Sequence, residues 1–387
     1  MQAFRVSDVV YRVYTLAVFL MFLNSMYPWY MWNNNLSQMT LLLTATFSIL
    51  LMIFNQDKIN IKYKDAGLYM LIVIFILLLF LSSPGMSFAF IFVTWVTLLS
   101  LRDEYKMHIL SFVTKGFAIL LFVSLVFYVF FLFGISTTPT IIQYIDGRYV
   151  SFNYLFFIVR IDVVDFYRFQ SIFMEPGHLT MGLVPLIMAN RFDLRNKYVL
   201  LLFIVELFTF SLAGYITMLI GYLLFNFTFR RLKYILVGFL FLCVAVLIFD
   251  KTGNSEILDK FLWNRLEFSN RDISGNNRTT EEFNRVYEGV INSSYRWLGK
   301  NNVDIESFGG NSGYKKFIVT NGLIGLLAVL LLYGYNAIIY KRKDVVIFTF
   351  ILLLLLFQNS YPLWFSVFFV YIAGSTNLIK YEKAICR

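Results

Sequence analysis

Cysteine, histidine and charged residues are all scarce in this 387-residue chain. Its two cysteines, Cys243 inside an apolar run and Cys386 near the C-terminus, form no disulfide framework and match no metal-ligand spacing. The sequence contains no Walker loop, zinc cluster, DxD metal motif or Ser/His/Asp set with useful spacing. We therefore expect any chemistry to be metal-independent and to use no cofactor.

Apolar residues dominate instead. Hydrophobic residues make up 59% of the chain and charged residues 14%, which lies far outside the range of soluble globular proteins. Apolar runs long enough to cross a hydrocarbon core of ~30 Å recur from end to end. The sequence therefore predicts an all-α polytopic membrane protein, a single integral membrane domain over residues 1–387 with about twelve transmembrane helices. The expected spans are 10–29, 36–54, 66–82, 85–101, 108–134, 178–190, 198–211, 213–229, 234–249, 317–340, 345–357 and 361–379.

Basic residues alternate between the connections. Lys and Arg gather in every second one, whereas the short connections around 27–35, 82–86, 211–214 and 358–361 contain neither. By the positive-inside rule, both termini are cytoplasmic and the two long loops, 135–177 and 250–316, are external. The net charge of +10 thus reflects topology, and no nucleic-acid partner is needed to explain it.

Arginine is unusually frequent in the two external loops. Its planar fork suits phosphate groups, although each of these residues could equally form salt bridges with the acidic residues of the same loops. The loop arginines are Arg148, Arg160, Arg168, Arg265, Arg271, Arg278, Arg285 and Arg296.

The first loop ends in a concentrated polar corner, with Arg168 followed by Glu175, Pro176 and His178. Pro176 favours a helix start, so Glu175 is expected near the cap and the positive end of the helix dipole faces outside. Glu175 could accept a proton from a substrate hydroxyl while Arg168 holds a phosphate. Alternatively, Glu175 only caps the helix and pairs with Arg168, and His178 only forms a hydrogen bond at the helix surface.

The segments around this corner are also informative. Residues 147–173 are rich in aromatic and β-branched residues, and we expect them at the lipid headgroup level, either extended or as a half-buried helix. The spans that follow are short, interrupted by Pro185 and by a tight turn at 211–215. Short helices of this kind often line a cavity, but a thin bilayer or helix tilt would also explain them.

In the second loop, Thr279-Thr280-Glu281-Glu282 matches a capping box, and apolar residues at helical spacing reach Trp297. We expect a helix of about five turns there. Arg278 precedes its start and suits an anion, whereas Arg285 could simply pair with Glu281. Glycines in 308–314 and 321–325 would let backbone amides approach a ligand closely, with a mobile linker as the alternative.

Taken together, these motifs resemble the Wzy-type polymerases of O-antigen and capsular polysaccharide. The resemblance rests on the corner from Arg168 to Gly182, on Ser211-Leu-Ala-Gly-Tyr215, on the arginine-bearing second loop, and on its Gly-Gly-Asn-Ser-Gly-Tyr314 exit. It covers roughly residues 135–335. It implies a GT-C-like fold in the bacterial inner membrane with a periplasmic active site.

What the resemblance implies is transfer of a growing glycan from undecaprenyl diphosphate to the next lipid-linked repeat unit, with inversion at the donor carbon. Undecaprenyl diphosphate-linked oligosaccharide would be both donor and acceptor, with membrane lipid, a chain-length regulator and a flippase as further partners. Glu175 would be the base, with His178 as the second choice. The residues expected to bind the diphosphate or substrate are Arg168 and Arg278 first, then Arg285, Arg265 and Arg271, with Arg160, Asn311 and Tyr314.

Two alternatives stay open. The related O-antigen ligases typically carry a histidine near the end of the second loop, where this chain has Asn311 and Tyr314, which favours a polymerase over a ligase-like glycosyltransferase. A lipid-linked oligosaccharide flippase or transporter would fit the number of spans. Transporters, however, usually place several polar groups near the midplane. Here, apart from Arg12 at the cytoplasmic edge of the first span, only Lys115 and Glu206 are charged within the predicted spans.

Overall fold

The computed structural model describes residues 6–32, 35–82, 84–144, 149–161, 167–226, 268–269, 272–273, 280–300, 303, 313–358 and 361–385. Contacts divide the chain into two compact units. Unit 1 comprises residues 1–222, 327–357 and 361–387, and unit 2 comprises 223–326 and 358–360. The two units are described separately.

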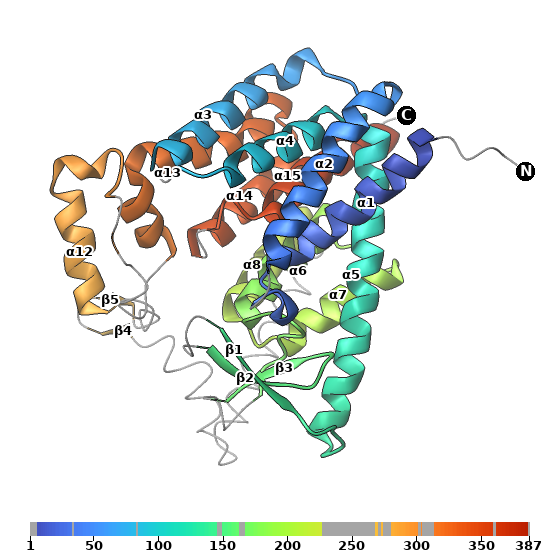
Figure 1. The fold of residues 1–387 in the computed structure, drawn as a ribbon, viewed down its shortest axis with the longest axis vertical. Coiled ribbons are helices and arrows are strands. Elements are labelled where there is room, and N and C mark those ends of the chain that lie inside the picture. The colour runs from blue at the N-terminus through green and yellow to red at the C-terminus, as the bar shows by residue number, and fades with distance from the viewer. Residues whose placement is uncertain are drawn as a thin grey trace, which may run out of the picture. The chain divides into compact units, whose positions relative to one another are not determined.

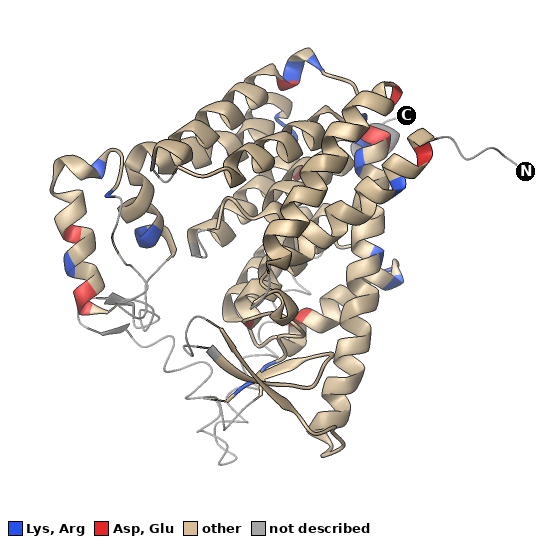
Figure 2. Ribbon diagram, in the orientation of Figure 1, with Lys and Arg blue, Asp and Glu red and all other residues tan. Residues whose placement is uncertain are grey.

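Apolar helices of 14 to 30 residues form the first half of unit 1 (Figure 1). They are α1 (Val6–Asn24), α2 (Leu36–Phe54), α3 (Ala66–Ser82), α4 (Ser87–Ser100) and α5 (Asp103–Leu132). The 30 residues of α5 extend over about 45 Å at 1.5 Å per residue. Charged residues lie mainly at the helix ends (Figure 2), because an unpaired charge in hydrocarbon is costly.

Shorter helices follow, namely α6 (Pro176–Ala189), α7 (Lys197–Phe208) and α8 (Leu212–Phe225). The chain returns to unit 1 through α13 (Gly313–Tyr340), α14 (Lys343–Gln358) and α15 (Phe365–Ile385). Helix α15 is central, since it packs against α1, α4, α5 and α6. Phe368 of α15 stacks face to face on Trp95 of α4, with ring centroids 3.8 Å apart.

The predicted spans compare well with the described helices. Every span except 234–249, which lies outside the described residues, coincides with a helix, so the chain is a mostly helical membrane protein. Five helical segments in the described part are long and apolar enough to cross a membrane: 6–24, 36–54, 63–81, 103–132 and 313–340. The short α6, α7 and α8 confirm the prediction that the middle spans are abbreviated.

A small antiparallel sheet occupies the first long loop. Its strands are β1 (Thr140–Tyr144), β2 (Tyr149–Asn153) and β3 (Ile158–Arg160), in the order β1-β2-β3. In the register, Tyr144 pairs with Tyr149 and Ser151 with Arg160. Of the two forms expected for this stretch, the extended one is therefore correct for these strands. The β-branched and aromatic residues that favour strands explain the choice.

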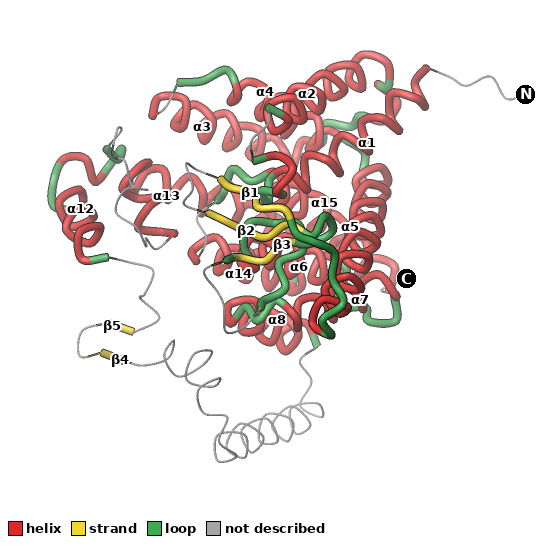
Figure 3. The backbone as a smooth tube through the Cα atoms, turned by 60° about the horizontal axis from the view of Figure 1, so that its bottom comes forward, coloured by secondary structure: helices red, strands yellow, loops and turns green. Residues whose placement is uncertain are grey.

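The sheet lies at one end of unit 1, and the ends of α1 and α15 nearest the two termini lie at the other (Figure 1). Figure 3, turned toward the sheet, shows the three strands side by side in front of the helices. We call these the sheet end and the terminal end. At the sheet end, Phe127 near the close of α5 stacks on Phe156 with ring centroids 4.4 Å apart, so aromatic packing joins sheet and helix.

Unit 2 contains the short hairpin β4 (Phe268–Ser269) and β5 (Asp272–Ile273), helix α12 (Glu281–Ile291) and the first turns of α13. Thr280 caps α12 by accepting a hydrogen bond from the Phe283 amide at 3.2 Å. The prediction of about five turns was wrong. The helix ends at Ile291 because Ser293 caps a separate 3₁₀ turn, Ser294–Arg296, which places Trp297 beyond the helix.

Helix α13 is interrupted at Gly322, whose φ of 67° is not helical. Gly299 also has a positive φ, and a Cβ on it would lie 2.2 Å from the Thr320 carbonyl oxygen. A Cβ on Gly322 would lie 2.3 Å from the Trp297 carbonyl oxygen. Both positions therefore need glycine. The expectation that Gly322 brings backbone close to a ligand is replaced by an approach to the chain's own backbone.

Candidate functional site

The start of α6 carries the most suggestive charge arrangement among the described residues. Glu175 occupies the N-cap position with extended backbone, and Pro176 is the first helical residue, as predicted. The Glu175 side chain makes no cap hydrogen bond. Its Oε1 lies 3.5 Å from Nη1 of Arg160, and the two side chains are 37% and 28% exposed, respectively. The corner thus presents a solvent-accessible carboxylate and guanidinium beside a helix N-terminus.

The pairing differs from the structural alternative considered for the sequence, in which Arg168 would pair with Glu175. That alternative was wrong, because strand β3 brings Arg160 to Glu175, while Arg168 is held elsewhere. Nε and Nη2 of Arg168 donate to the carbonyl oxygens of Thr209 and Phe210 at 3.2 and 3.0 Å. These carbonyls follow the last turn of α7, where a cation is favourable.

His178 lies one turn inside α6 and is only 4% exposed. Its ring packs edge-on against Trp364 and Tyr361, at centroid distances of 4.9 and 5.6 Å, and lies 5.8 Å from Tyr27. Its Nδ1 has no hydrogen-bond partner within the described residues. The expected hydrogen bond at the helix surface is therefore replaced by burial among aromatic rings. A role as base stays a prediction.

Sequence reasoning gave Glu206 no role beyond charge balance, yet its carboxylate is fully buried between helices. Its Oε1 accepts from Thr180 Oγ1 at 2.8 Å and from Thr209 Oγ1 at 3.4 Å, and its Oε2 is buried without a partner. A carboxylate within an apolar helix was the available signal. Thr209, three residues along the chain, and Thr180, 26 residues away on α6, compensate part of its desolvation.

The Ser211-Leu-Ala-Gly-Tyr215 motif is explained by this carboxylate. A Cβ on Gly214 would lie 1.8 Å from Oε1 of Glu206, so any larger residue would force the buried carboxylate to shift. Tyr215 donates from its hydroxyl to the Leu207 carbonyl oxygen. The motif therefore forms the tight turn between α7 and α8 and closes it over Glu206.

A pocket of about 220 Å³ lies at the sheet end of unit 1. Its walls are aromatic and amide side chains, with Ser37 and Met31 between them: Tyr27, Trp32 and Tyr144, and Asn24, Asn35 and Gln38. Trp32, Met174 and Ile158 belong to one hydrophobic cluster. The pocket is thus joined through shared packing to the residues that precede Glu175 and Arg160. Partial burial raises the pKa of nearby Tyr30 to about 12.

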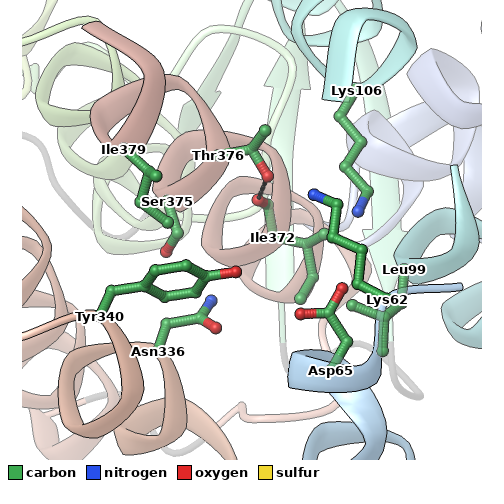
Figure 4. A pocket seen from close by; sticks show the side chains of 10 residues that line it. All are labelled: Lys62, Asp65, Leu99, Lys106, Asn336, Tyr340, Ile372, Ser375, Thr376 and Ile379. Carbon is green, nitrogen blue, oxygen red and sulfur yellow. Dashed lines mark hydrogen bonds between the residues drawn. The ribbon is translucent and has the colours of Figure 1, made fainter. Parts of the chain in front are cut away.

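A second, smaller pocket of about 20 Å³ lies at the terminal end (Figure 4). The amino groups of Lys62 and Lys106 and the carboxylate of Asp65 point into it, and Lys106 is only 2% exposed. Lys62 pairs with Asp103, and Lys380 lies 3.9 Å from the other oxygen of Asp103. Opposite charges therefore cross-link the starts of α3 and α5 to the end of α15. The space is too small for more than about one water molecule.

The predicted residues of the second loop are only partly described. Arg265, Arg271, Arg278 and Asn311 lie outside the described residues. Arg285 lies 4.0 Å from Glu281 on the exposed face of α12, which confirms the expected helix pair, and Tyr314 lies half-buried in the first turn of α13. Both belong to unit 2.

Among the predicted site residues, the structure thus brings Glu175 and Arg160 together, with Arg168 and His178 in the same unit. Within the described ranges, no group of three His, Cys, Asp or Glu residues is placed to hold a metal ion. No protein-family model, curated protein or solved structure matches the chain.

Proposed function

We propose that this membrane protein is a glycosyltransferase that joins lipid diphosphate-linked oligosaccharide repeat units at the outer face of the membrane. The observation that carries the proposal is the partly exposed Arg160–Glu175 pair at the N-terminus of α6. A carboxylate can accept the proton of a sugar hydroxyl, while a guanidinium and a helix N-terminus stabilise a departing diphosphate. The three elements meet at this corner.

The sequence of events follows from the pair itself. The diphosphate of an incoming substrate competes for the Arg160 guanidinium, which frees Glu175 to take a proton from the acceptor hydroxyl. The acceptor oxygen then attacks the anomeric carbon as its bond to the diphosphate breaks, and the diphosphate leaves as an anion. Arg168 and the second-loop residues Arg278, Arg285, Arg265 and Arg271 are the further diphosphate ligands of this proposal, with Asn311 and Tyr314 at the loop exit.

The proposal also includes the finer topology: about twelve crossings with a GT-C-like arrangement, both termini in the cytoplasm, and a periplasmic site in the bacterial inner membrane. Its support is the asymmetry of unit 1. The lysine-rich pairs and both terminal helix ends occupy the terminal end, while the Arg160–Glu175 pair and the pocket occupy the sheet end. By the positive-inside rule, the terminal end is cytoplasmic.

The test is polymer formation by purified protein from synthetic undecaprenyl diphosphate-linked repeat units, without added metal or nucleotide sugar. We expect products longer than the single unit by mass spectrometry and gel electrophoresis. Absence of any product in vesicles that contain correctly folded protein would contradict the proposal. If the glycan is transferred only once, to a lipid acceptor other than the repeat unit, the protein is instead a ligase-like enzyme.

One observation favours a second candidate, a flippase or transporter for lipid-linked oligosaccharides. Glu206 is a buried carboxylate within an apolar helix, and such groups often mark transport pathways. Deletion of the chain from its host separates the two. Loss of polymer with continued export of single repeat units supports the polymerase, whereas units trapped inside the cell support the flippase.

A further inference from the structure

The 220 Å³ pocket at the sheet end has a chemistry different from that of the arginines nearby. Among the described residues that line it, none is charged; they are three aromatic residues, three amides, one serine and one methionine. Amides both donate and accept hydrogen bonds, and aromatic faces pack against apolar ring surfaces. A ligand with hydroxyl groups and a flat apolar face fits these walls, whereas a phosphate finds no cation in them.

The size of the pocket narrows the ligand further. Sites that enclose drug-sized ligands occupy roughly 300–1,000 Å³, and this pocket is somewhat smaller. It accommodates one ring of a larger molecule that continues into solvent. An acyl chain is a poor fit because three amide side chains would lose their hydrogen bonds to water against it.

The walls are fixed before any ligand arrives. Tyr27 has a φ of 57°, an unusual conformation for an aromatic residue. Its carbonyl oxygen accepts from Trp32 Nε1 at 3.0 Å and from the Met174 amide at 3.2 Å. The Asn24 side-chain amide donates to the Ser37 carbonyl oxygen at 3.2 Å. The hydrogen bonds hold the strained residue, and strain of this kind is frequent at ligand sites.

The same bonds connect the pocket to the Arg160–Glu175 pair. Met174, which bonds to Tyr27, directly precedes Glu175, and Ile158, which packs with Trp32 and Met174, lies on the strand that ends at Arg160. Trp32 and Tyr144 lie with ring centroids 5.3 Å apart across one wall. A ring bound here would be positioned relative to the carboxylate by a continuous, rigid frame.

We propose that this pocket is a binding subsite for one uncharged sugar ring of the glycan. The inference deepens the proposed function, and it rests on that function only for the identity of the molecule that carries the sugar. Stacking against the aromatic wall and hydrogen bonds to Asn35 and Gln38 hold the ring. The subsite thereby fixes the distance between the glycan and Glu175.

The experiment uses the full chain in phospholipid nanodiscs, because maltoside and glucoside detergents would occupy a sugar site. Methyl glycosides of glucose, galactose, mannose, rhamnose and N-acetylglucosamine are the probes, and saturation-transfer NMR reports their binding. We expect transfer to at least one glycoside, and at least a tenfold weaker affinity in an Asn35→Leu and Gln38→Leu double variant. Both side chains are exposed, so this variant should still fold. Tyr63→Leu, which replaces a 95% exposed aromatic residue at the terminal end, is the control and should bind normally.

The outcomes separate this inference from the proposed function. Glycoside binding that the double variant retains, absence of binding by every probe, or displacement by inorganic pyrophosphate overturns the subsite, even if polymer forms in the assay above. Binding lost in the double variant, with no polymer formed by the wild-type chain, supports the subsite and overturns the polymerase. If both stand, the double variant should raise KM for the lipid-linked substrate more than it lowers kcat.

Discussion

At the terminal end of unit 1, Lys62, Asp103 and Lys380 pair with one another between helix ends, and Lys106 is almost fully buried. At the sheet end, Arg160 and Glu175 form one partly exposed pair beside a neutral pocket. Both ends carry partly exposed opposite charges in proximity, but the described pocket at the sheet end has a volume of about 220 Å³ and the one at the terminal end about 20 Å³. Adjoining space, more than the number or the exposure of the charges, therefore indicates where substrate chemistry is possible.

The largest expected effect is at the sheet end. Glu175→Gln should lower the rate of polymer formation by about 10²- to 10⁴-fold, because the amide cannot accept the hydroxyl proton. The polymer assay with purified protein measures the rate, and the unfolding midpoint should stay unchanged. Glu104→Gln, the same substitution at an exposed position of the terminal end, is the matched control and should keep full activity. A mild loss in Glu175→Gln would leave Glu175 as an ion-pair residue only.

A second substitution tests whether the buried carboxylate of Glu206 has a structural role. Gly214→Ala should lower the free energy of unfolding by about 1–3 kcal/mol, because the new Cβ overlaps Oε1 of Glu206. Combining it with Glu206→Ala should cost less than the sum of the single effects. Gly334→Ala is the control, since nothing lies within 4 Å of a Cβ there. Additive losses in the double variant would show that the two positions do not interact.

Arg168→Lys keeps the charge but removes the fork that reaches two carbonyl groups. Loss of one charged hydrogen bond should lower stability by about 1.5 kcal/mol, seen as a lower thermal midpoint in nanodiscs. Arg195→Lys, at an exposed position, should change the midpoint by no more than about 0.5 kcal/mol in equivalent free energy. If Arg168→Lys instead abolishes polymer formation and leaves the thermal midpoint unchanged, the main role of Arg168 is to bind diphosphate. Its hydrogen bonds to the end of α7 would then contribute little to stability.

The smallest effect is expected at the terminal end. Asp103→Asn weakens its pairs with Lys62 and Lys380, which are partly exposed, so the loss should be about 0.5–1 kcal/mol of stability. Polymer formation should be unaffected, in contrast to Glu175→Gln. Asp57→Asn, an exposed carboxylate nearby, is the control for stability. Lost activity without lost stability in Asp103→Asn would move the functional site to the terminal end and reverse the comparison.

Hydropathy was sufficient to predict the helices, because each described helix that coincides with an expected span follows an apolar run with charged or turn residues at its ends. Pro176 likewise predicted the start of α6 correctly. Local rules therefore worked wherever one segment decides its own structure. The length of α12 was the exception, since a new cap at Ser293 ended a pattern that could have continued.

The candidate site was harder to predict because its contacts join distant segments. The partner of Glu175 depends on the register of β2 and β3, which hydropathy does not encode, so Arg168 was considered in place of Arg160. Glu206 has a local partner in Thr209, but its second partner, Thr180, lies 26 residues away on another helix. The aromatic pocket combines the connection after α1 with Tyr144 of β1. These segments are more than 100 residues apart, and no local pattern in the sequence predicts that they meet.

The glycine contact in unit 2 has a mechanical consequence. Since Gly299 and Gly322 let two stretches of backbone touch directly, with the Lys300 amide donating to Val319 and the Ile324 amide donating to Trp297, the segment after α12 is clamped to the break in α13. No side chain separates the two stretches of backbone at these glycines. A displacement of the segment after α12 would therefore displace the first turns of α13 as well.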